Sequence, residues 1–318
     1  MFEAGQRTYV IAEIGANHNG DMDLARRMID RANDIGCDCV KFQSWNSDIF
    51  AKEVYDQNYF LTDDYRDRDD YSLKEIVDEY AVSADQLGEL KAYCDEVGID
   101  FASTPFERVQ IDDLVRLDAP FIKIASMDLN NDHLLGHAAA TGKTILLSTG
   151  FGSLAEIEHA VKTIEAAGNR NIVLLHCVSL YPPRDDQVNL NNMDMLGEAF
   201  GYPVGYSDHT IGVEVSLAAI AKGAVALEKH YTLDKEMTGW DHAISADPDE
   251  LAAIVRGAER IHAALGSRRR EPPEDDAQKA AYRRSIVSAR DIKAGEKIDE
   301  AALTFRRPGA GIEPNVAP

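Results

Sequence analysis

The sequence predicts an α/β fold, a (β/α)₈ TIM barrel followed by a small C-terminal domain, and three observations support this prediction. First, residues 1–266 alternate short runs of β-branched residues with amphipathic helical runs, which is the pattern of parallel βα units. Second, eight such runs occur, and eight parallel strands close a barrel of this kind. Third, a chain of 318 residues has room for one such domain and a small appendage.

Each predicted strand is followed by a helical segment or by a loop that leads into one. The strands are expected at residues 9–14, 39–43, 99–104, 121–125, 144–148, 172–176, 203–206 and 225–230. Capping boxes mark two helix starts, Ser83 with Gln86 and Ser153 with Glu156, and Asp247 precedes a proline at the first position of another helix. These signals predict where helices begin and assign no function.

Two segments interrupt the repeat. Residues 44–80 form an acidic and aromatic insertion that is too long for an ordinary βα loop, so we expect a lid or a contact surface, with a solvated excursion as the alternative. Residues 267–280 are rich in Arg, Glu, Asp and Pro, and they are predicted to link the barrel, residues 1–266, to the small domain, residues 281–318.

The composition excludes several classes of partner. With 33 basic and 55 acidic residues the formal charge is −22, which disfavours nucleic acid and anionic membranes as partners. No run approaches the roughly 18 apolar residues that a membrane span needs, and the start of the chain lacks the pattern of a signal peptide. The four cysteines lack metal-site spacing and are expected to be reduced, buried thiols. We therefore expect a soluble, cytoplasmic protein.

Polar residues end nearly every predicted strand, which is where the active sites of such barrels lie. They are Glu13, Lys41, Gln43, Ser103, Thr104, Lys123, Ser126, Ser148, His176, Ser207, Asp208, His209, Glu228 and His230. Two lysines and several small hydroxyls at one rim suit a phosphate or another dianion. A Schiff-base role for Lys123 is the alternative, and it is disfavoured because no single lysine stands apart from the others.

Two histidines follow the last two predicted strands, which are neighbours in a barrel. His209 and His230 are accompanied in the sequence by the carboxylates of Asp208, Asp241 and Glu13. Neutral imidazoles and carboxylates are common ligands of divalent metals, so the sequence predicts a metal site with positions left open for substrate oxygens. Two structural histidines are the alternative interpretation.

Seven ordered segments make the chain similar to a known family. They are AEIGANHNG at 12–20, VKFQ at 40–43, STPF at 103–106, KIAS at 123–126, LSTG at 147–150, SDHT at 207–210 and EKH at 228–230. Together they resemble the N-acetylneuraminate (sialic acid) synthase family. The resemblance implies a TIM barrel with a C-terminal antifreeze-like (SAF) domain, of which residues 281–318 match only the first part. It also implies a domain-swapped homodimer in which Arg307 reaches a substrate bound by the other subunit.

The resemblance also assigns residues to substrates. It places phosphoenolpyruvate on Lys41, Thr104, Lys123, Ser126, Ser148 and Ser207. It places the amino sugar on Glu13, Gln43, Tyr181, Asp241 and Arg307. It places a divalent metal, usually Mn²⁺ with Mg²⁺ or Co²⁺ as alternatives, on His209 and His230.

Three positions depart from the family pattern. Ser179 stands where an Asn commonly contacts phosphoenolpyruvate, and Asp128 stands where a Glu is common. Trp240 replaces a common Pro beside Asp241, where a bulky indole would reshape the sugar pocket or serve only in packing.

The implied activity is that of a transferase that condenses phosphoenolpyruvate with N-acetylmannosamine or a related acetamido sugar. The expected catalytic residues are Glu13, Lys41, Asp128, His209 and His230, with Asp128 or Glu13 activating a water. One alternative is a legionaminic or pseudaminic acid synthase that uses a 2,4-diacetamido-trideoxy sugar. Two others are a 3-deoxy-sugar acid synthase that acts on a phosphorylated aldose and a non-catalytic carbohydrate-binding homologue.

Overall fold

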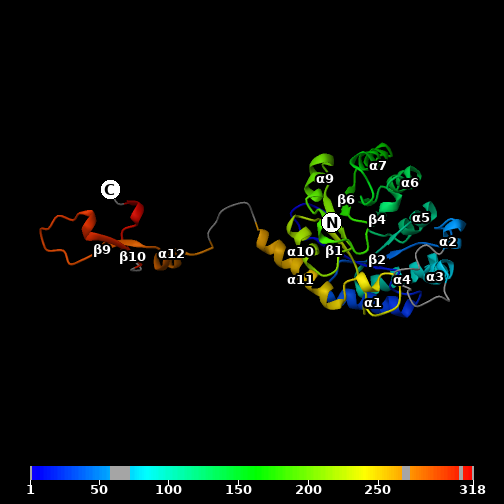
Figure 1. The fold of residues 1–318 in the computed structure, drawn as a ribbon, viewed down its shortest axis with the longest axis horizontal. Coiled ribbons are helices and arrows are strands. Elements are labelled where there is room, and N and C mark those ends of the chain that lie inside the picture. The colour runs from blue at the N-terminus through cyan, green and yellow to red at the C-terminus, as the bar shows by residue number, and fades with distance from the viewer. Residues whose placement is uncertain (1, 58–71, 267–272, 308–310, 317–318) are drawn as a thin grey trace. The chain divides into compact units, whose positions relative to one another are not determined.

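The computed structural model describes residues 2–57, 72–266, 273–307 and 311–316. The chain divides into two compact units, Met1–Leu265 and Gly266–Pro318 (Figure 1). Most of the acidic stretch of the predicted insertion, residues 58–71, lies outside the described residues.

The first unit is built on eight parallel strands. They are β1 (Tyr9–Gly15), β2 (Cys39–Gln43), β3 (Asp100–Thr104), β4 (Phe121–Ile124), β5 (Thr144–Ser148), β6 (Ile172–Cys177), β7 (Val204–Asp208) and β8 (Ala226–His230). Hydrogen-bonded neighbours run in the order β3-β2-β1-β8-β7-β6-β5-β4. The two end strands, β3 and β4, also lie beside each other, so the sheet forms a near-closed barrel and the predicted fold class is confirmed.

Helices surround the strands (Figure 1). They are α1 (Met22–Ile35), α2 (Lys52–Gln57), α3 (Leu73–Tyr80), α4 (Ala84–Val97), α5 (Arg108–Arg116), α6 (Asp132–Ala140), α7 (Leu154–Ala166), α8 (Asp185–Val188), α9 (Asn192–Phe200), α10 (Glu214–Ala221) and α11 (Pro248–Leu265). The capping boxes predicted at Ser83 and Ser153 are present, and Asp247 accepts a hydrogen bond from the backbone N–H of Glu250 at the start of α11. These caps satisfy donors that a helix start leaves unpaired.

All eight predicted strands are present, with small shifts at their ends. β7 continues to Asp208 and β6 to Cys177, beyond the predicted ends. The reason is that parallel pairing continues there, with Cys177 opposite Ser207 and Asp208 opposite Lys229. The polar ends of the strands are therefore inside the sheet, and their side chains alternate between its two faces.

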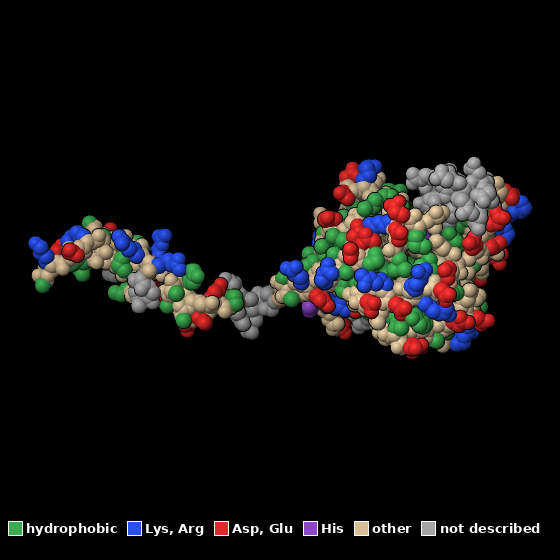
Figure 2. All heavy atoms as spheres, turned by 90° about the horizontal axis from the view of Figure 1, so that it is seen from below, with side chains coloured by type: hydrophobic (Ala, Val, Ile, Leu, Met, Phe, Trp, Pro, Cys, Tyr) green, Lys and Arg blue, Asp and Glu red, His purple; other side chains and the backbone are tan. Residues whose placement is uncertain are grey.

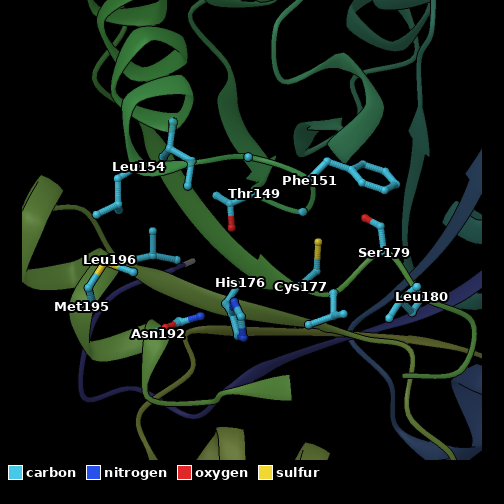
Figure 3. A pocket seen from close by; sticks show the side chains of 14 residues that line it. Thr149, Phe151, Leu154, His176, Cys177, Ser179, Leu180, Asn192, Met195 and Leu196 are labelled. Atoms are coloured by element: carbon cyan, nitrogen blue, oxygen red, sulfur yellow. The ribbon is translucent and has the colours of Figure 1, made fainter. Parts of the chain in front are cut away.

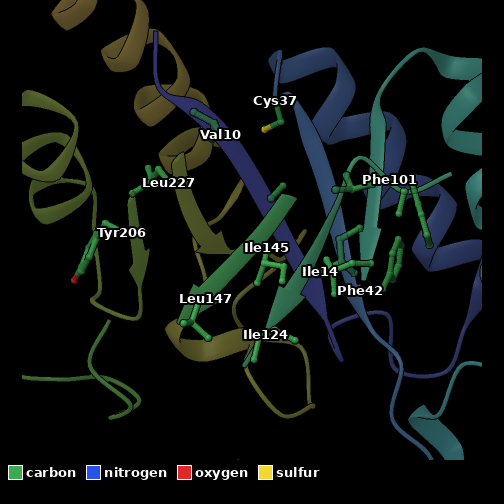
Figure 4. Packing of buried hydrophobic residues seen from close by; sticks show 14 of the residues in the cluster. Val10, Ile14, Cys37, Phe42, Phe101, Ile124, Ile145, Leu147, Tyr206 and Leu227 are labelled. Atoms are coloured by element: carbon green, nitrogen blue, oxygen red, sulfur yellow. The ribbon is translucent and has the colours of Figure 1, made fainter. Parts of the chain in front are cut away.

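Alternation along the strands separates two apolar regions. Side chains such as Val10, Ile14 and Leu147 point outward and pack against the helices (Figure 4). Inward-pointing side chains, among them Ile11 and Phe121, fill the barrel interior. Because both faces of a parallel sheet are buried, most strand residues are apolar, and the polar inward residues at the carboxyl ends stand out.

The second unit contains a short helix and a two-stranded sheet. The helix α12 spans Asp276–Tyr282, and β9 (Ser285–Ser288) pairs antiparallel with β10 (Leu303–Arg306). The predicted linker, residues 267–280, thus contains the start of a helix. Asp275 and Gln278 form the capping box that begins this helix, a local signal that the acidic composition of the segment obscured.

Charges of both signs lie on the surface of the first unit that is shown in Figure 2. On the face shown in Figure 2, Lys and Arg side chains are interspersed with Asp and Glu. Across the described residues, we find no helix with the length and apolar character required to cross a membrane.

Candidate active site

The barrel interior changes from apolar to polar along each strand. In β1 the inward residues run from Tyr9 and Ile11 to Glu13, and in β8 they run from Ala226 to Glu228 and His230. The apolar members fill the amino end of the barrel, while the polar members gather at the carboxyl end. So many buried polar side chains at one end of a barrel are typical of a ligand site.

Four buried charged residues form the centre of this site. The Lys41 ammonium lies 2.7 Å from Glu13 Oε2 and 3.6 Å from Glu228 Oε2, and Lys123 Nζ lies 3.6 Å from Glu228 Oε1. All four side chains are almost completely buried. We call Glu13, Lys41, Lys123 and Glu228 the charged cluster.

The pKa values within the charged cluster diverge. Burial raises the pKa of Glu13 to about 7, and Lys41 offsets this effect only in part. Burial opposes ionisation of Glu228 as well, but Lys123 and Lys41 hold its pKa at about 2. Burial lowers the pKa of Lys123. Neighbouring carboxyl groups whose pKa values are shifted in opposite directions are typical of sites that transfer protons.

Hydroxyl groups surround the charged cluster. Lys41 Nζ donates to Thr104 Oγ1 at 2.7 Å, and Ser207 Oγ donates to Glu228 Oε1 at 2.9 Å. Ser148 Oγ is buried, and among the described residues it has no hydrogen-bond partner. An unpaired buried hydroxyl costs free energy, so its presence at the carboxyl end of β5 favours a bound ligand that supplies the partner.

A second group of small side chains surrounds Gly150. The Ser126 hydroxyl accepts from the Gly150 N–H at 3.1 Å and lies 3.0 Å from Cys177 Sγ. A Cβ atom at Gly150 would lie only 2.3 Å from Ser179 Oγ, so glycine is required for this close approach. Gly150, Cys177 and Ser179 also line a cavity of about 410 Å³ whose other walls come from α7 and α9 (Figure 3).

His209 and His230 face each other at the same end of the barrel, with ring centroids 5.5 Å apart. His209 Nδ1 lies 2.7 Å from the Val178 carbonyl, which only accepts, so Nδ1 carries the proton and Nε2 keeps its lone pair. Burial lowers the pKa of both histidines, which keeps them neutral. His230 Nδ1 is buried without a hydrogen-bond partner among the described residues, and Asp241 Oδ2 lies 3.5 Å from it.

This pair fits a divalent metal with an incomplete protein shell. Neutral imidazoles with available lone pairs are metal ligands, and the unpartnered His230 nitrogen favours a bound cation. In the part of the chain that the structure describes, no group of three or more His, Cys, Asp or Glu residues has a metal-binding arrangement. Within the described residues, the pair therefore leaves coordination positions open.

Three of the residues assigned to the sugar, Gln43, Tyr181 and Asp241, lie beside Glu13 or the histidines. Gln43 donates to Glu13 Oε1 at 3.1 Å, and the Tyr181 ring stacks on His209 with centroids 4.1 Å apart. Trp45, which lies two residues after Gln43, packs against Trp240, and their ring centroids are 5.0 Å apart. Trp240 thus takes part in packing, and it immediately precedes Asp241.

Not every predicted strand-end residue points into the barrel. Ser103 bonds to Ser44, His176 lies 2.7 Å from the Val188 carbonyl, and Asp208 forms an ion pair with Lys229. These side chains lie on the helix side of the sheet, so Asp208 does not join the histidine pair as the sequence suggested. Neighbouring positions on a strand face opposite ways, which separates Asp208 from Ser207.

Two further predicted residues, Asp128 and Arg307, have contacts within their own parts of the chain. Asp128 is half-buried and accepts from Asn131 Nδ2 at 2.9 Å. Burial raises its pKa. Arg307 belongs to the second unit, where its guanidinium lies 4.4 Å from the centroid of the Tyr282 ring. The assigned roles of Asp128 and Arg307 remain predictions.

Glu228 contacts both lysines, a role that was not predicted from its position at a strand end. The available signal was its spacing, because Glu228 lies two residues before His230 and therefore faces the same way. Lys229, between them, faces the helices.

Comparison with known proteins places this geometry in a family. The NeuB family model matches residues 28–270, and the SAF domain model matches residues 283–318. An uncharacterized protein of Methanocaldococcus jannaschii is 41% identical over 310 residues, which cover 97% of this chain and 87% of that protein. The N,N'-diacetyllegionaminic acid synthase of Campylobacter jejuni is 38% identical over 311 residues, 96% of this chain and 92% of the relative.

A solved structure agrees with these matches. The N-acetylneuraminic acid (sialic acid) synthetase from Leptospira borgpetersenii serovar Hardjo-bovis has a TM-score of 0.73 and 36% sequence identity, and the match covers 84% of this chain and 88% of that one. The resemblance found in the seven motifs is confirmed. The chain belongs to the NeuB family and carries an SAF domain at its C-terminal end.

Proposed function

We propose that this protein condenses phosphoenolpyruvate with N-acetylmannosamine or a related acetamido sugar, giving a nine-carbon nonulosonic acid and phosphate. The observation that carries the proposal is the charged cluster beside the histidine pair, at the carboxyl end of the barrel. The names of the relatives, a legionaminic acid synthase and a sialic acid synthetase, support the substrate class.

The charged cluster suits phosphoenolpyruvate because the net charge of the cluster can change when Glu13 takes up a proton. With both carboxylates ionised, two lysines and two glutamates sum to zero. The pKa of Glu13, about 7, lets that residue take a proton near neutral pH, which leaves the cluster net positive for an incoming anion. Ser148, Thr104 and the group around Gly150 supply the hydroxyl and N–H donors that hold carboxylate and phosphate oxygens.

His209 and His230 would hold the divalent metal, proposed as Mn²⁺. Bound there, the metal supplies Lewis-acid polarisation of a carbonyl oxygen. The Val178 carbonyl fixes the tautomer of His209, and the Tyr181 ring limits its motion. Gln43 lies beside Glu13 and Asp241 lies beside His230, and both would offer hydrogen bonds to sugar hydroxyl and acetamido groups.

The reaction needs one new C–C bond and the loss of phosphate. The C3 carbon of phosphoenolpyruvate attacks the sugar aldehyde, whose oxygen takes the proton held by Glu13 and becomes a hydroxyl, and positive charge develops at C2. Glu13, ionised by that transfer, takes a proton from a water that adds to C2. The C–O bond to phosphate then breaks, and the new C2 hydroxyl gives its proton to the departing phosphate as the keto group forms. Lys41 and Lys123 orient the anion, and such positioning contributes up to roughly 7–11 kcal/mol.

The rim of the barrel supports a proposed homodimer. Large apolar side chains are exposed on the loops after β4, β5, β6 and β7, and Phe151 is 78% exposed. Its companions are Met127, Leu180, Tyr181 and Ile211. An apolar rim of this kind favours a covering partner, and we propose the SAF domain of a second copy, which brings Arg307 to the sugar.

The free, buried cysteines suit a reducing cytoplasm.

A phosphate-release assay tests the proposal. The purified protein is incubated with phosphoenolpyruvate, Mn²⁺ and either N-acetylmannosamine or a 2,4-diacetamido-2,4,6-trideoxy sugar, and the product is identified by mass spectrometry. We expect phosphate release with one of these sugars and loss of release when EDTA removes the metal. Release that is undiminished in EDTA would refute the metal role. Sugar binding without release under any condition would favour a non-catalytic homologue.

A further inference from the structure

A second buried ion pair lies behind the histidines, on the helix side of the barrel. Asp208 and Lys229 are register partners on β7 and β8, and Lys229 Nζ lies 3.0 Å from Asp208 Oδ2. Their side chains are at most 1% exposed. Neither residue belongs to the charged cluster.

The Asp208 carboxylate is fully engaged by its surroundings. Its Oδ1 accepts from the Thr210 N–H at 2.9 Å and from the Thr210 hydroxyl at 2.8 Å, while its Oδ2 accepts from Ser216 and Lys229. Lys229 also donates to the Thr210 carbonyl. The turn 208–210 is thus closed on itself and joined to β8 and to α10.

This network holds the backbone on both sides of His209 and on the amino-terminal side of His230. His209 lies between Asp208 and Thr210, and His230 directly follows Lys229. A buried ion pair is weak evidence for stability, because well-packed apolar residues often replace such pairs without loss. The hydrogen bonds of the Asp208 and Lys229 network are directional, unlike apolar packing. They therefore fix the turn that carries His209 relative to the strand that carries His230.

We propose that Asp208 and Lys229 are positioning residues that set the separation and orientation of the His209 and His230 imidazoles. They touch neither substrate nor metal and act through the histidines. The inference rests on the proposed function in one respect only, namely that the histidine pair binds a divalent metal.

Metal affinity in matched variants tests the proposal. Mn²⁺ binding is measured by titration calorimetry and electron paramagnetic resonance for the full-length wild type and for Asp208→Asn/Lys229→Met, which removes both buried charges together. We expect the dissociation constant to rise roughly 10- to 100-fold, the usual effect of losing a group that orients a metal ligand. If the double variant does not fold, the same Mn²⁺ titration is made with Asp208→Asn alone.

Two controls separate positioning from general stability. Lys222→Met removes an exposed pair with Asp194, and Leu135→Ala destabilises the helix side of the barrel far along the sheet. Both should bind Mn²⁺ like the wild type. Unchanged Mn²⁺ affinity in the folded Asp208 and Lys229 variants would overturn the inference.

A readout without metal distinguishes this proposal from the proposed function. Long-range ¹H–¹⁵N spectra should show the Nδ1–H tautomer of His209 fixed in the wild type and in Leu135→Ala, but averaged in Asp208→Asn/Lys229→Met. If the wild type binds no Mn²⁺, the metal role fails and the tautomer spectra alone decide the positioning role. A tautomer that stays fixed in the double variant would overturn it.

Discussion

Lys41 connects the two carboxylates of the charged cluster. Its ammonium lies within 2.7 Å of Glu13 and 3.6 Å of Glu228, and all three groups are buried. Removing the ammonium would leave two neighbouring buried carboxylates with less positive charge to balance them. Lys41 therefore has two roles, because it would bind the substrate and it also stabilises the fold by balancing the buried carboxylates.

The variant Lys41→Met should accordingly be both inactive and unstable. We expect the free energy of unfolding to fall by about 3–5 kcal/mol, the usual cost of removing one partner from a buried ion pair. Urea denaturation followed by circular dichroism measures it. Lys74→Met, which breaks an exposed pair with Asp78, is the control and should leave stability unchanged. A Lys41→Met protein as stable as the wild type would contradict the role assigned to this ion pair.

The raised pKa of Glu13 predicts a pH dependence of stability. Between the unfolded value of 4.5 and the folded value of about 7, the folded state binds the extra proton, so stability should decrease as pH rises through this window. The loss attributable to Glu13 is on the order of 3 kcal/mol. In Glu13→Gln this component should vanish. The measurement is the urea midpoint of both proteins at pH 5 and pH 8, and parallel changes in the two would refute the assignment.

At the scale of elements, the loop after β5 shows how a backbone position shapes the site. Gly150 lies where three side chains converge, from the segment after β4, from the end of β6 and from the loop that follows β6. A methyl group there would lie 2.7 Å from Ser126 Oγ and 2.9 Å from Cys177 Sγ. Those atoms would have to move, because such short contacts are not tolerated in a packed interior.

We expect Gly150→Ala to raise KM for phosphoenolpyruvate roughly 10- to 100-fold, since a displacement of about 1 Å in a site has effects of this size. Steady-state kinetics of phosphate release measure it. The matched control is Gly136→Ala in α6, where an added Cβ meets no atom within 4 Å and alanine favours the helix. Equal KM values for Gly150→Ala and the wild type would show that Ser126 and Ser179 do not contact this substrate.

At the scale of the whole molecule, the proposed swap of SAF domains predicts complementation between two defective variants. His209→Gln removes a proposed metal ligand from the barrel, and Arg307→Ala removes the proposed contribution of the SAF domain. Each variant alone should be inactive. If Arg307 serves the barrel of the other subunit, a mixed dimer has one complete site, and random mixing should restore about a quarter of wild-type activity.

The measurement is phosphate release after the two variants are unfolded and refolded together, with each refolded alone as the control. Sedimentation confirms that the mixture contains dimers. Recovery no greater than that of the separate variants would mean that Arg307 acts within its own chain or not at all.

The sequence by itself determined the order of strands, the helix starts and the set of polar strand ends. These are local properties, because a capping box such as Ser153 with Glu156 acts over one turn and a strand end is marked by a few residues. The motifs also brought Glu13, Lys41 and the two histidines into one prediction. Their convergence follows once eight parallel strands form one barrel.

Only the tertiary structure decided which polar side chains face the interior. Both faces of a parallel barrel strand are buried, so hydrophobicity does not distinguish inward from outward positions. Asp208 and Ser207 are adjacent, yet Asp208 pairs with Lys229 outside the barrel while Ser207 bonds to Glu228 inside it. The spacing of Glu228 to His230 indicates that it faces inward, but its contacts with Lys41 and Lys123 depend on strand register and on the closure of the barrel, which no local pattern encodes.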